Sequence, residues 1–287
     1  MFLVMAILKQ PGSDIWIRDG FSIDDALSRT THLGIGAHQD DLEFMAYEGI
    51  AACYESEDLW FSGITVTDGR SSSRKGAYAD YTDNEMRVAR MAEQRKAAEI
   101  GRYSAQIQLD YMSKEVKVDA CEAVVEDLVA LLRKMKPNTV YLHQPADKHD
   151  AHVAVLGRCI EALRRAADFH IPDRIIGCEV WRSLDWLADS DKIAMDCGAY
   201  PELTESLNAV FDSQITGGKR YDLAVLGRRR ANATFFDTHG SDIYTSVTWG
   251  IDLKPLVEDT SLSMEALILE KMVELSRNVA NRVSKFS

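Results

Sequence analysis

Short apolar runs alternate with longer segments of helix-forming residues along most of this chain, and this alternation limits the fold more than any other feature. Runs such as Leu33–Ala37 (LGIGA), Leu59–Thr67 (LWFSGITVT) and Thr139–Leu142 (TVYL) are typical of buried strands. Helix formers fill the segments between them, as in 84–100, where Gly101 suits a helix end. Strands that alternate with helices of this length predict a mainly parallel sheet that is covered by helices on both faces.

Further elements follow the same alternation. The sequence predicts strands over 105–109, 175–181 and 192–197, and helices over 41–54, 119–135, 152–167, 203–215, 221–236 and 264–283. No internal repeat or Pro/Gly-rich linker interrupts this pattern. Residues 1–30 precede the first predicted strand and are expected to form an N-terminal appendage, with a short helix after Ser22. Residues 31–287 are expected to form a single α/β domain.

Composition excludes several kinds of partner. The 287 residues carry a net charge of −12, which argues against binding to a nucleic-acid backbone, because such binding relies on clustered Lys and Arg. The cluster Arg228–Arg230 is expected to be a solvated helix face. The apolar start up to Leu8 is interrupted by Lys9 and lacks the features of a signal peptide, and no later apolar run reaches membrane-spanning length. The five cysteines form no CxxC pair, so free thiols and a cytoplasmic location are expected.

Two motifs that combine histidine and aspartate directly follow two of the predicted strands. Ala37–Asp41 (AHQDD) ends the first strand, and Asp147–His152 (DKHDAH) lies in the loop after TVYLH. Ligands gather at the carboxyl ends of the strands in such sheets, so both loops are expected to contribute to one site. Each motif alone is weak evidence. Asp40 would also suit a helix cap, and His149 or His152 would also suit a hydrogen-bonded surface position.

The residue types in these two motifs suit a catalytic zinc ion. Two imidazoles and one carboxylate leave one coordination position for water, and bound zinc lowers the pKa of that water to about 7. A carboxylate that is not a ligand can then take the proton as a general base, so the doublet Asp40–Asp41 offers one ligand and one base. A histidine beside the metal can stabilise an oxyanion or protonate the leaving amine. The sequence therefore predicts a metal-dependent hydrolytic site.

At these residues the sequence resembles the LmbE-like (PIG-L type) family, to which N-acetylglucosaminyl-phosphatidylinositol de-N-acetylase belongs. The family motif A-H-P-D-D is similar to Ala37–Asp41, and its D-x-H-P-D-H motif is similar to Asp147–His152. Weaker similarities are an R-x-x-E helix that starts at Arg90, a turn at Thr67–Gly69 and the pair Ser213–Gln214. The resemblance implies a Rossmann-like, three-layer α/β sandwich with a mainly parallel sheet.

The resemblance also implies a role for the residues of both motifs. It implies that His38, Asp41 and His152 hold Zn²⁺, or another divalent metal. It implies that Asp40 is the general base and that His149 assists the tetrahedral intermediate. Because the departing amine needs a proton, we expect the His149 imidazole to be cationic and its pKa to be raised by a neighbouring carboxylate.

Other residues are expected to surround this centre. By resemblance Arg90 matches a substrate-contacting arginine, although a solvated helix arginine is the alternative. Asp68 and Arg70 lie in the long loop after the second strand, and such loops often border a binding site. Asp147 and Asp150 are the acidic residues of the second motif, and one of them is expected to support the assisting histidine.

The chain departs from the family pattern at three places. Gln39 replaces the usual proline, Asp150–Ala151 replaces the usual Pro-Asp, and Phe211–Asp212 occupies a position where family members often carry a histidine. The first change removes no ligand, whereas the other two alter the surroundings of the site. Trp181, at a strand end, is expected to pack in the core, and His143 is expected to lie outside the ligand set.

The implied activity is removal of the acetyl group from an N-acetylated amino sugar or its conjugate, a small-molecule substrate. One alternative is an amidase that acts on a sugar-linked thiol conjugate. Another is a Rossmann-like binding protein that keeps the metal but has lost catalysis. A dinucleotide-dependent oxidoreductase is disfavoured, because AHQDD follows the first strand in place of a G-x-G-x-x-G turn. The sequence leaves the oligomeric state open, with a homo-oligomer as one alternative.

Overall fold

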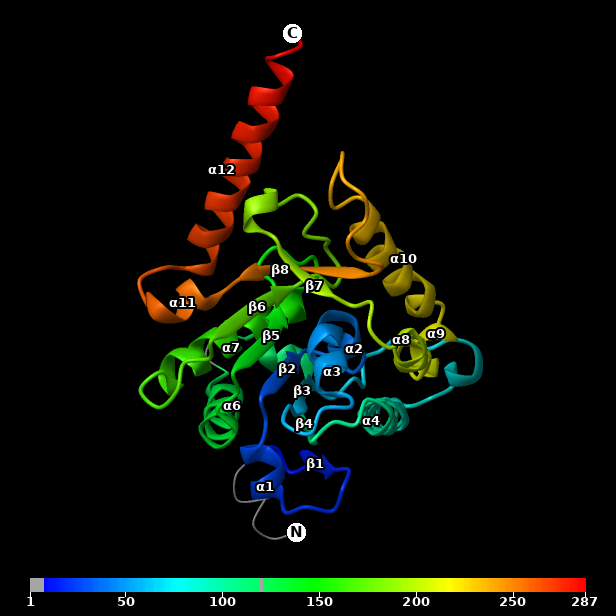
Figure 1. Cartoon of the computed structure of the whole chain (residues 1–287). Helices are drawn as coiled ribbons and strands as arrows, with labels where there is room; N and C mark the ends of the chain where they lie inside the picture. Colours follow the sequence, from blue (N-terminus) through cyan, green and yellow to red (C-terminus); the bar gives the residue numbers. More distant parts are fainter. Residues whose placement is uncertain (1–7, 119–120) are drawn as a thin grey trace.

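Eight strands form one central sheet in the computed structural model, which describes residues 8–118 and 121–287 (Figure 1). The sheet order is β1-β4-β3-β2-β5-β6-β8-β7. The strands are β1 (Asp14–Ile17), β2 (His32–Gly36), β3 (Phe61–Thr67), β4 (Ala105–Tyr111), β5 (Thr139–His143), β6 (Arg174–Cys178), β7 (Ile193–Asp196) and β8 (Val247–Asp252). The five central strands, from β4 to β6, pair in parallel, while β1, β8 and β7 pair antiparallel with their neighbours. The predicted mixed α/β fold with a mainly parallel sheet is confirmed.

Helices cover both faces of this sheet. The α-helices are α1 (Ile23–Ser28), α2 (Asp41–Met45), α3 (Tyr47–Cys53), α4 (Asp83–Ile100), α5 (Ser113–Val116), α6 (Glu122–Met135), α7 (Asp150–Ala166), α8 (Pro201–Ala209), α9 (Asp212–Ile215), α10 (Tyr221–Thr234), α11 (Lys254–Glu258) and α12 (Met264–Val283). One apolar cluster joins the sheet to α1, α6, α7 and α11, and a second joins it to α2, α3, α4 and α8 (Figure 1). Every residue of β3 is buried, as expected for a strand with helices on both sides.

Several elements differ from the prediction. The sequence analysis did not predict β1 and β8, which are short antiparallel strands at or near the sheet edges. The predicted helices over 41–54 and 203–215 are each broken into two, at Ala46 and around Val210. No Gly or Pro marks either break, so local sequence gives no warning. The predicted helix over 119–135 begins at Glu122, and residues 119–120 lie outside the described part of the chain.

The topology places β2 and β5 side by side at the centre of the sheet. The chain continues from β2 to β3 on one side of this pair and from β5 to β6 on the other, so β2 and β5 meet where the strand order reverses. In open α/β sheets a ligand binds beside the carboxyl ends of strands at such a point. Both predicted motifs begin at the carboxyl ends of these two strands.

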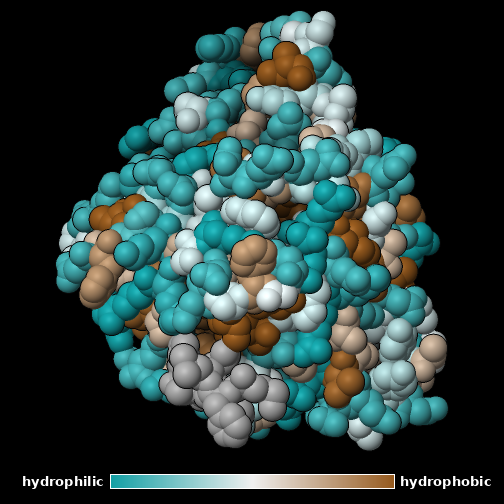
Figure 2. Space-filling view, turned by 60° about the horizontal axis from the view of Figure 1, so that its bottom comes forward, coloured by the Kyte–Doolittle hydropathy of each residue, from teal (hydrophilic) through white to brown (hydrophobic). Residues whose placement is uncertain are grey.

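The surface, the helix composition and the cysteines can also be compared with the prediction. The face drawn in Figure 2 is largely hydrophilic, with apolar side chains in scattered small groups. Within the described ranges, no helix combines the length and the apolar composition that crossing a membrane requires. All five cysteines are free thiols, as predicted. The division of the chain into an appendage of residues 1–30 and a domain of residues 31–287 stays a prediction.

Candidate metal centre and active site

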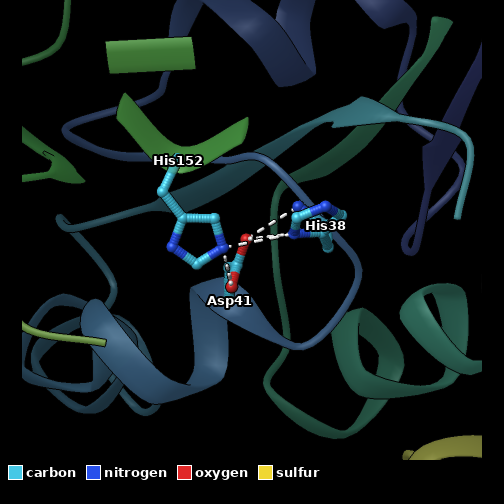
Figure 3. A group of neighbouring side chains, drawn as sticks. All are labelled: His38, Asp41 and His152. Atoms are coloured by element: carbon cyan, nitrogen blue, oxygen red, sulfur yellow. Dashed lines mark hydrogen bonds and ion pairs between the residues drawn. The ribbon is translucent and has the colours of Figure 1, made fainter. Parts of the chain in front are cut away.

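The two motifs meet at the carboxyl ends of β2 and β5. His38 lies in the turn after β2, Asp41 begins α2, and His152 lies in the first turn of α7. The Nδ1 atom of His38 is 3.2 Å from the Nε2 atom of His152 and 3.4 Å from the Asp41 carboxylate. The same carboxylate is 3.4 Å from His152 Nε2. Figure 3 shows the three side chains pointing toward one another, His38 and Asp41 from the turn into α2 and His152 from α7.

These three residues fit a divalent metal. Their ligand atoms all lie within 4.8 Å of one another. Burial lowers the pKa of His152 to about 4, so its imidazole is neutral, as a metal ligand must be. Burial alone would raise the pKa of Asp41, but the imidazoles of His152 and His143 hold that pKa well below its usual range. Two imidazoles and a carboxylate form the donor set of a catalytic zinc site with an open position.

Asp147 fixes the orientation of one of these imidazoles. Its Oδ2 atom is 3.4 Å from the Nδ1 atom of His152, on the side of the ring that faces away from Asp41. The same oxygen accepts a hydrogen bond from the backbone N–H of Trp181, and the carboxylate is fully buried. A carboxylate on the far nitrogen fixes the tautomer of a metal-binding histidine and raises its basicity as a ligand. Asp147 therefore supports His152.

His143 lies directly beneath this cluster. Its ring is buried and stacks on that of His152, with 3.8 Å between the ring centroids. Its Nε2 atom accepts a hydrogen bond from the Ala37 N–H and is 3.3 Å from the Asp41 carboxylate. A second group with metal-binding spacing, His143, Asp147 and His152, shares His152 with the first. Because His38 and Asp41 line the cavity described below, the first group is the one that a substrate can reach.

Asp40 is held next to the ligand cluster in a conformation that few residues adopt. Its φ of 89° lies in the left-handed region, which costs energy for a residue with a side chain. Its backbone N–H donates to Gln94 (3.1 Å), and its carboxylate accepts from Arg90 (3.1 Å). The side chain makes no capping hydrogen bond to α2, so the alternative that it caps this helix is wrong. Burial raises the pKa of Asp40 to about 7, although Arg90 opposes this shift.

A buried network stabilises this conformation from α4. Gln94 accepts from Asp40 through Oε1 and donates through Nε2 to the Glu43 carboxyl group (2.8 Å). Tyr103 donates to the same Glu43 oxygen (2.7 Å), and burial raises the pKa of Glu43 to about 8. Arg90 also donates to the Gln39 carbonyl. The turn that carries Asp40 is thus fixed by several partners.

Arg90 is fully buried in the wall of the cavity, so its interpretation as a solvated helix arginine is wrong. Asp68 also lines this cavity, and its carboxylate pairs with Arg70, which lies outside the lining. Asp150 is exposed at the first position of α7 and makes no hydrogen bond or ion pair with the site histidines among the described residues. Substrate contacts by Arg90, Asp68 and Arg70 stay a prediction.

His149 differs from its expected state. Its Nδ1 atom accepts a hydrogen bond from the Ala151 N–H (3.3 Å), so the ring caps the start of α7. Asp147 accepts from the His149 backbone N–H and meets the ring of His152 instead. Burial and His38 lower the pKa of His149, against the opposing charges of Asp41 and Asp147. The expectation that His149 has a raised pKa and a cationic imidazole is wrong, because burial and His38 outweigh these carboxylates.

A cavity of about 390 Å³ opens beside the cluster. Its lining includes four residues of the two motifs, the loop after β3, and a wall made by the segment after β6 together with α10. Trp181 and Tyr221 belong to that wall, with 6.1 Å between their ring centroids, and Lys219 lies over the Trp181 ring at 5.0 Å. Trp181 therefore lines the site, and the expectation that it packs in the core is wrong.

The cluster Arg228–Arg230 is not a uniformly solvated helix face. Arg229 is buried and donates to the carbonyls of Glu43 (2.8 Å) and Phe44 (3.1 Å), at the carboxyl end of α2. Arg228 lines the cavity and donates to the Val180 carbonyl. The sequence analysis missed the roles of Arg228 and Arg229. It also included 179–181 in the predicted strand 175–181, whereas this strand ends at Cys178, which leaves 179–181 at the edge where ligands gather.

The three departures from the family pattern have structural counterparts. The Gln39 side chain donates to the Thr67 carbonyl and to Gln108, both at 3.2 Å, and so ties the turn to β3 and β4. Ala151 supplies the N–H that His149 accepts. Phe211 is buried beneath Arg90, with 5.8 Å from the guanidinium carbon to the ring. An apolar side chain thus occupies the position where the family often carries a histidine.

Comparisons with known proteins agree with this geometry. Residues 33–163 match the family model described as GlcNAc-PI de-N-acetylase, PIG-L. A search of curated proteins finds no match. Similar solved structures include the 4-carboxy-2-hydroxymuconate hydratase GalB from Pseudomonas putida KT2440, with a TM-score of 0.61 and 17% identity over 78% of this chain and 96% of that chain.

Two further structures share the fold at similar levels. The conserved protein TT1542 from Thermus thermophilus has a TM-score of 0.60 and 18% identity, over 78% of this chain and 94% of that chain. N,N'-diacetylchitobiose deacetylase from Pyrococcus horikoshii has a TM-score of 0.59 and 14% identity, over 80% of this chain and 86% of that chain. The likeness to these proteins is one of fold. The segment 33–163, which holds both motifs, is a domain of the PIG-L, or LmbE-like, family.

Proposed function

We propose that this chain is a metal-dependent hydrolase that removes the acetyl group from an N-acetylated amino sugar or its conjugate. The observation that carries the proposal is the convergence of His38, Asp41 and His152 beside Asp40, at the wall of a cavity large enough for a sugar. The family match supports this reaction, since its model describes a de-N-acetylase. Zn²⁺ is the proposed ion, and another divalent metal is the alternative. The free cysteines favour the cytoplasm as the proposed location.

Asp40 moves the protons in this proposal. A divalent metal held by His38, Asp41 and His152 would act as a Lewis acid that acidifies water and polarises the amide carbonyl. Asp40, with a pKa of about 7, is matched to taking a proton from water near neutral pH. The same carboxyl group can then return that proton to the departing amine. Arg90 keeps the carboxyl group in place through both steps.

His149 acts as a neutral hydrogen-bond donor. Because its Nδ1 atom accepts from Ala151, a neutral ring carries its proton on Nε2. His149 lines the cavity, and in the proposal this N–H donates to the oxyanion that forms when the amide carbonyl is attacked. A neutral donor agrees with the lowered pKa of His149, whereas an imidazolium would not.

Three alternative functions would use the same residues: hydration, amide hydrolysis of another substrate, and metal binding without catalysis. The fold is also that of 4-carboxy-2-hydroxymuconate hydratase, so the fold does not by itself decide between amide hydrolysis and hydration. An amidase on a sugar-linked thiol conjugate would need the same ligands and base with a different substrate wall. A protein that binds metal without catalysis would keep the ligands and lack turnover. The family match favours the de-N-acetylase.

An activity screen with a defined metal content tests the proposal. The protein is purified without chelator, its metal is measured, and N-acetylglucosamine derivatives and a sugar-linked thiol amide are supplied. Release of free amine and acetate, abolished by a chelator and restored by Zn²⁺, is the expected result. Asp40→Asn in the same assay controls for a contaminating hydrolase. Metal-loaded protein that releases no amine from any of these substrates would contradict the proposal.

A further inference from the structure

Helix α12 presents apolar side chains to solvent after it leaves the body of the molecule. Figure 1 shows it as the red helix that projects beyond the sheet and carries the C-terminus. Its first turns pack on the core through Met264, Leu267 and Ile268. Beyond them, six large apolar side chains are between 44% and 88% exposed. These are Leu269, Met272, Val273, Val279, Val283 and Phe286.

Three of these side chains belong to one stripe along the helix. With 3.6 residues per turn, positions three or four apart fall on the same side of a helix. The stripe starts at a residue that is buried against the body and continues to the last residue of α12. Its members are Ile268, Met272, Leu275, Val279 and Val283. They fall within an arc of about 80°, which is the narrow seam of a helix that pairs with another helix.

A projecting helix of this kind needs a partner for its stability. Isolated helices of about 12–15 residues are marginal in water, and most helical stability in proteins comes from packing of an apolar face. Ser263 caps the start of α12 through the Ala266 N–H (3.0 Å), but such a cap stabilises by only about 1 kcal/mol. The exposed stripe is therefore the face whose burial would stabilise the outer turns.

The charges on α12 are distributed unevenly between its inner half, next to the body, and its outer half. The inner half carries Glu265, Glu270 and Glu274, together with Lys271, which pairs with Asp191 (2.9 Å). The outer half and the turn that follows it carry three basic residues and no acidic one: Arg277, Arg282 and Lys285. The order also complements the helix macrodipole, which favours acids near the start and bases near the end. The macrodipole does not, however, account for the apolar stripe.

We propose that the stripe of α12 packs against the stripe of a second copy of this chain, with the two helices antiparallel. An antiparallel pair centred near Arg277 brings Met272 opposite Val283 and Leu275 opposite Val279, so apolar residues meet along the whole contact. The basic outer half of each helix then lies against the acidic inner half of the other. A parallel pair would instead place like charges together at both ends, which is destabilising. The proposal is independent of the proposed activity.

The mass of the full chain in solution tests the pairing. Light scattering after size-exclusion chromatography is expected to give twice the mass of one chain. Val279→Glu with Val283→Glu places two charges on the stripe and should give the monomer. Asn281→Glu with Ser284→Glu adds the same charge on the opposite side of the same helix and should leave the dimer intact. Thermal unfolding of each variant checks that the body is folded.

Disulfide formation tests the orientation. Met272→Cys and Val283→Cys are made separately in a chain that carries Cys121→Ser, because the other four cysteines are buried. In the antiparallel pair, a mixture of the two variants forms a crosslink under mild oxidation, and neither variant alone does so. A crosslink in Met272→Cys alone indicates parallel helices and overturns the stated orientation.

Two further outcomes overturn the pairing itself. One is a wild-type chain that is monomeric across a concentration series. The other is a dimer that persists in Val279→Glu with Val283→Glu, because that dimer must use another surface. A monomer that binds vesicles of anionic lipid, with binding lost in the same double variant, would assign the stripe to a membrane surface instead.

Discussion

The two walls of the cavity differ in how firmly their side chains are held. On the side of α2 and α4, Asp40, Arg90 and Gln94 are buried and share hydrogen bonds with one another or with the backbone. On the side of α10, Trp181 is half-buried and Lys219 is exposed, and the two contact each other only through the ring face. Arg229 of α10 is also buried and hydrogen-bonded, so the difference is local to Trp181 and Lys219, whose side chains make no hydrogen bond to another described residue.

The two walls also differ in their relation to the family. The match covers residues 33–163, which include both motifs and the whole of α4. The wall made by 179–181 and α10 lies entirely outside that segment. The difference teaches that the proposed catalytic residues lie in the part of the chain that matches the family model. We expect the choice of substrate to depend on the wall outside that segment.

The largest expected effect is that of Asp41→Ala. Removing a carboxylate that lies between two imidazoles should abolish tight metal binding, and turnover should fall to background. Elemental analysis and amine release measure the two effects on the same sample. Asp58→Ala, at an exposed position outside the cavity lining, is the matched control. If Asp41→Ala keeps one metal per chain, Asp41 is not a required ligand, and the metal site proposed here is wrong.

Asp40→Asn should separate catalysis from metal binding. The variant should keep its metal and lose about 10²–10⁴-fold in turnover, the usual contribution of a general base. A base is active when deprotonated, so wild-type activity should rise with pH through the Asp40 pKa of about 7, and this limb should vanish in the variant. Rates measured from pH 5 to 9 test both points. Full activity in Asp40→Asn would exclude the base role.

Gln94→Leu should act through Asp40. Gln94 does not line the cavity, but it accepts the Asp40 N–H and donates to Glu43. Losing a buried partner costs about 1–3 kcal/mol, so kcat should fall about tenfold while KM and metal content stay unchanged. Lys96→Met, at an exposed position of α4, is the control. A rise in KM alone would mean that Gln94 positions the substrate, so that the wall at α2 and α4 would also contribute to substrate binding.

Trp181→Ala should have the smallest effect on turnover. Loss of an aromatic face should raise KM about fivefold and leave kcat within a few-fold, because stacking contributes about 1 kcal/mol in both ground and transition states. Initial rates over a range of substrate concentrations separate the two constants. Trp186→Phe, outside the cavity lining, is the control. If kcat falls as far as in Asp40→Asn, the proposed division between the walls is wrong.

The sequence predicted the parallel centre of the sheet and the meeting of the two motifs for good physical reasons. Strands buried on both faces, such as β3, consist largely of apolar, small and β-branched residues, and the carboxyl ends of β2 and β5 share one edge. The break between α2 and α3 could not be predicted, because Arg229, far along the chain, binds the carbonyls at the carboxyl end of α2.

It was equally hard to predict which histidine ring of the second motif the Asp147 carboxylate contacts. Asp147 is two residues from His149 and five from His152, yet its side chain meets the ring of His152. The turn into α7 directs the His149 ring to the Ala151 N–H instead. Which imidazole a carboxylate meets depends on the geometry at the start of that helix, and spacing in the sequence does not carry this information.

The left-handed backbone of Asp40 has a consequence for how this position can change during evolution. A residue with a side chain at φ 89° is strained by about 1–3 kcal/mol, whereas glycine adopts the same conformation freely. Asp40→Gly should therefore relieve strain at the site where it removes the proposed base. Glycine would also remove the buried carboxylate that accepts from Arg90, so the gain in stability is opposed by a loss. The aspartate at position 40 thus combines a strained backbone with the ion pair to Arg90 and the proposed base.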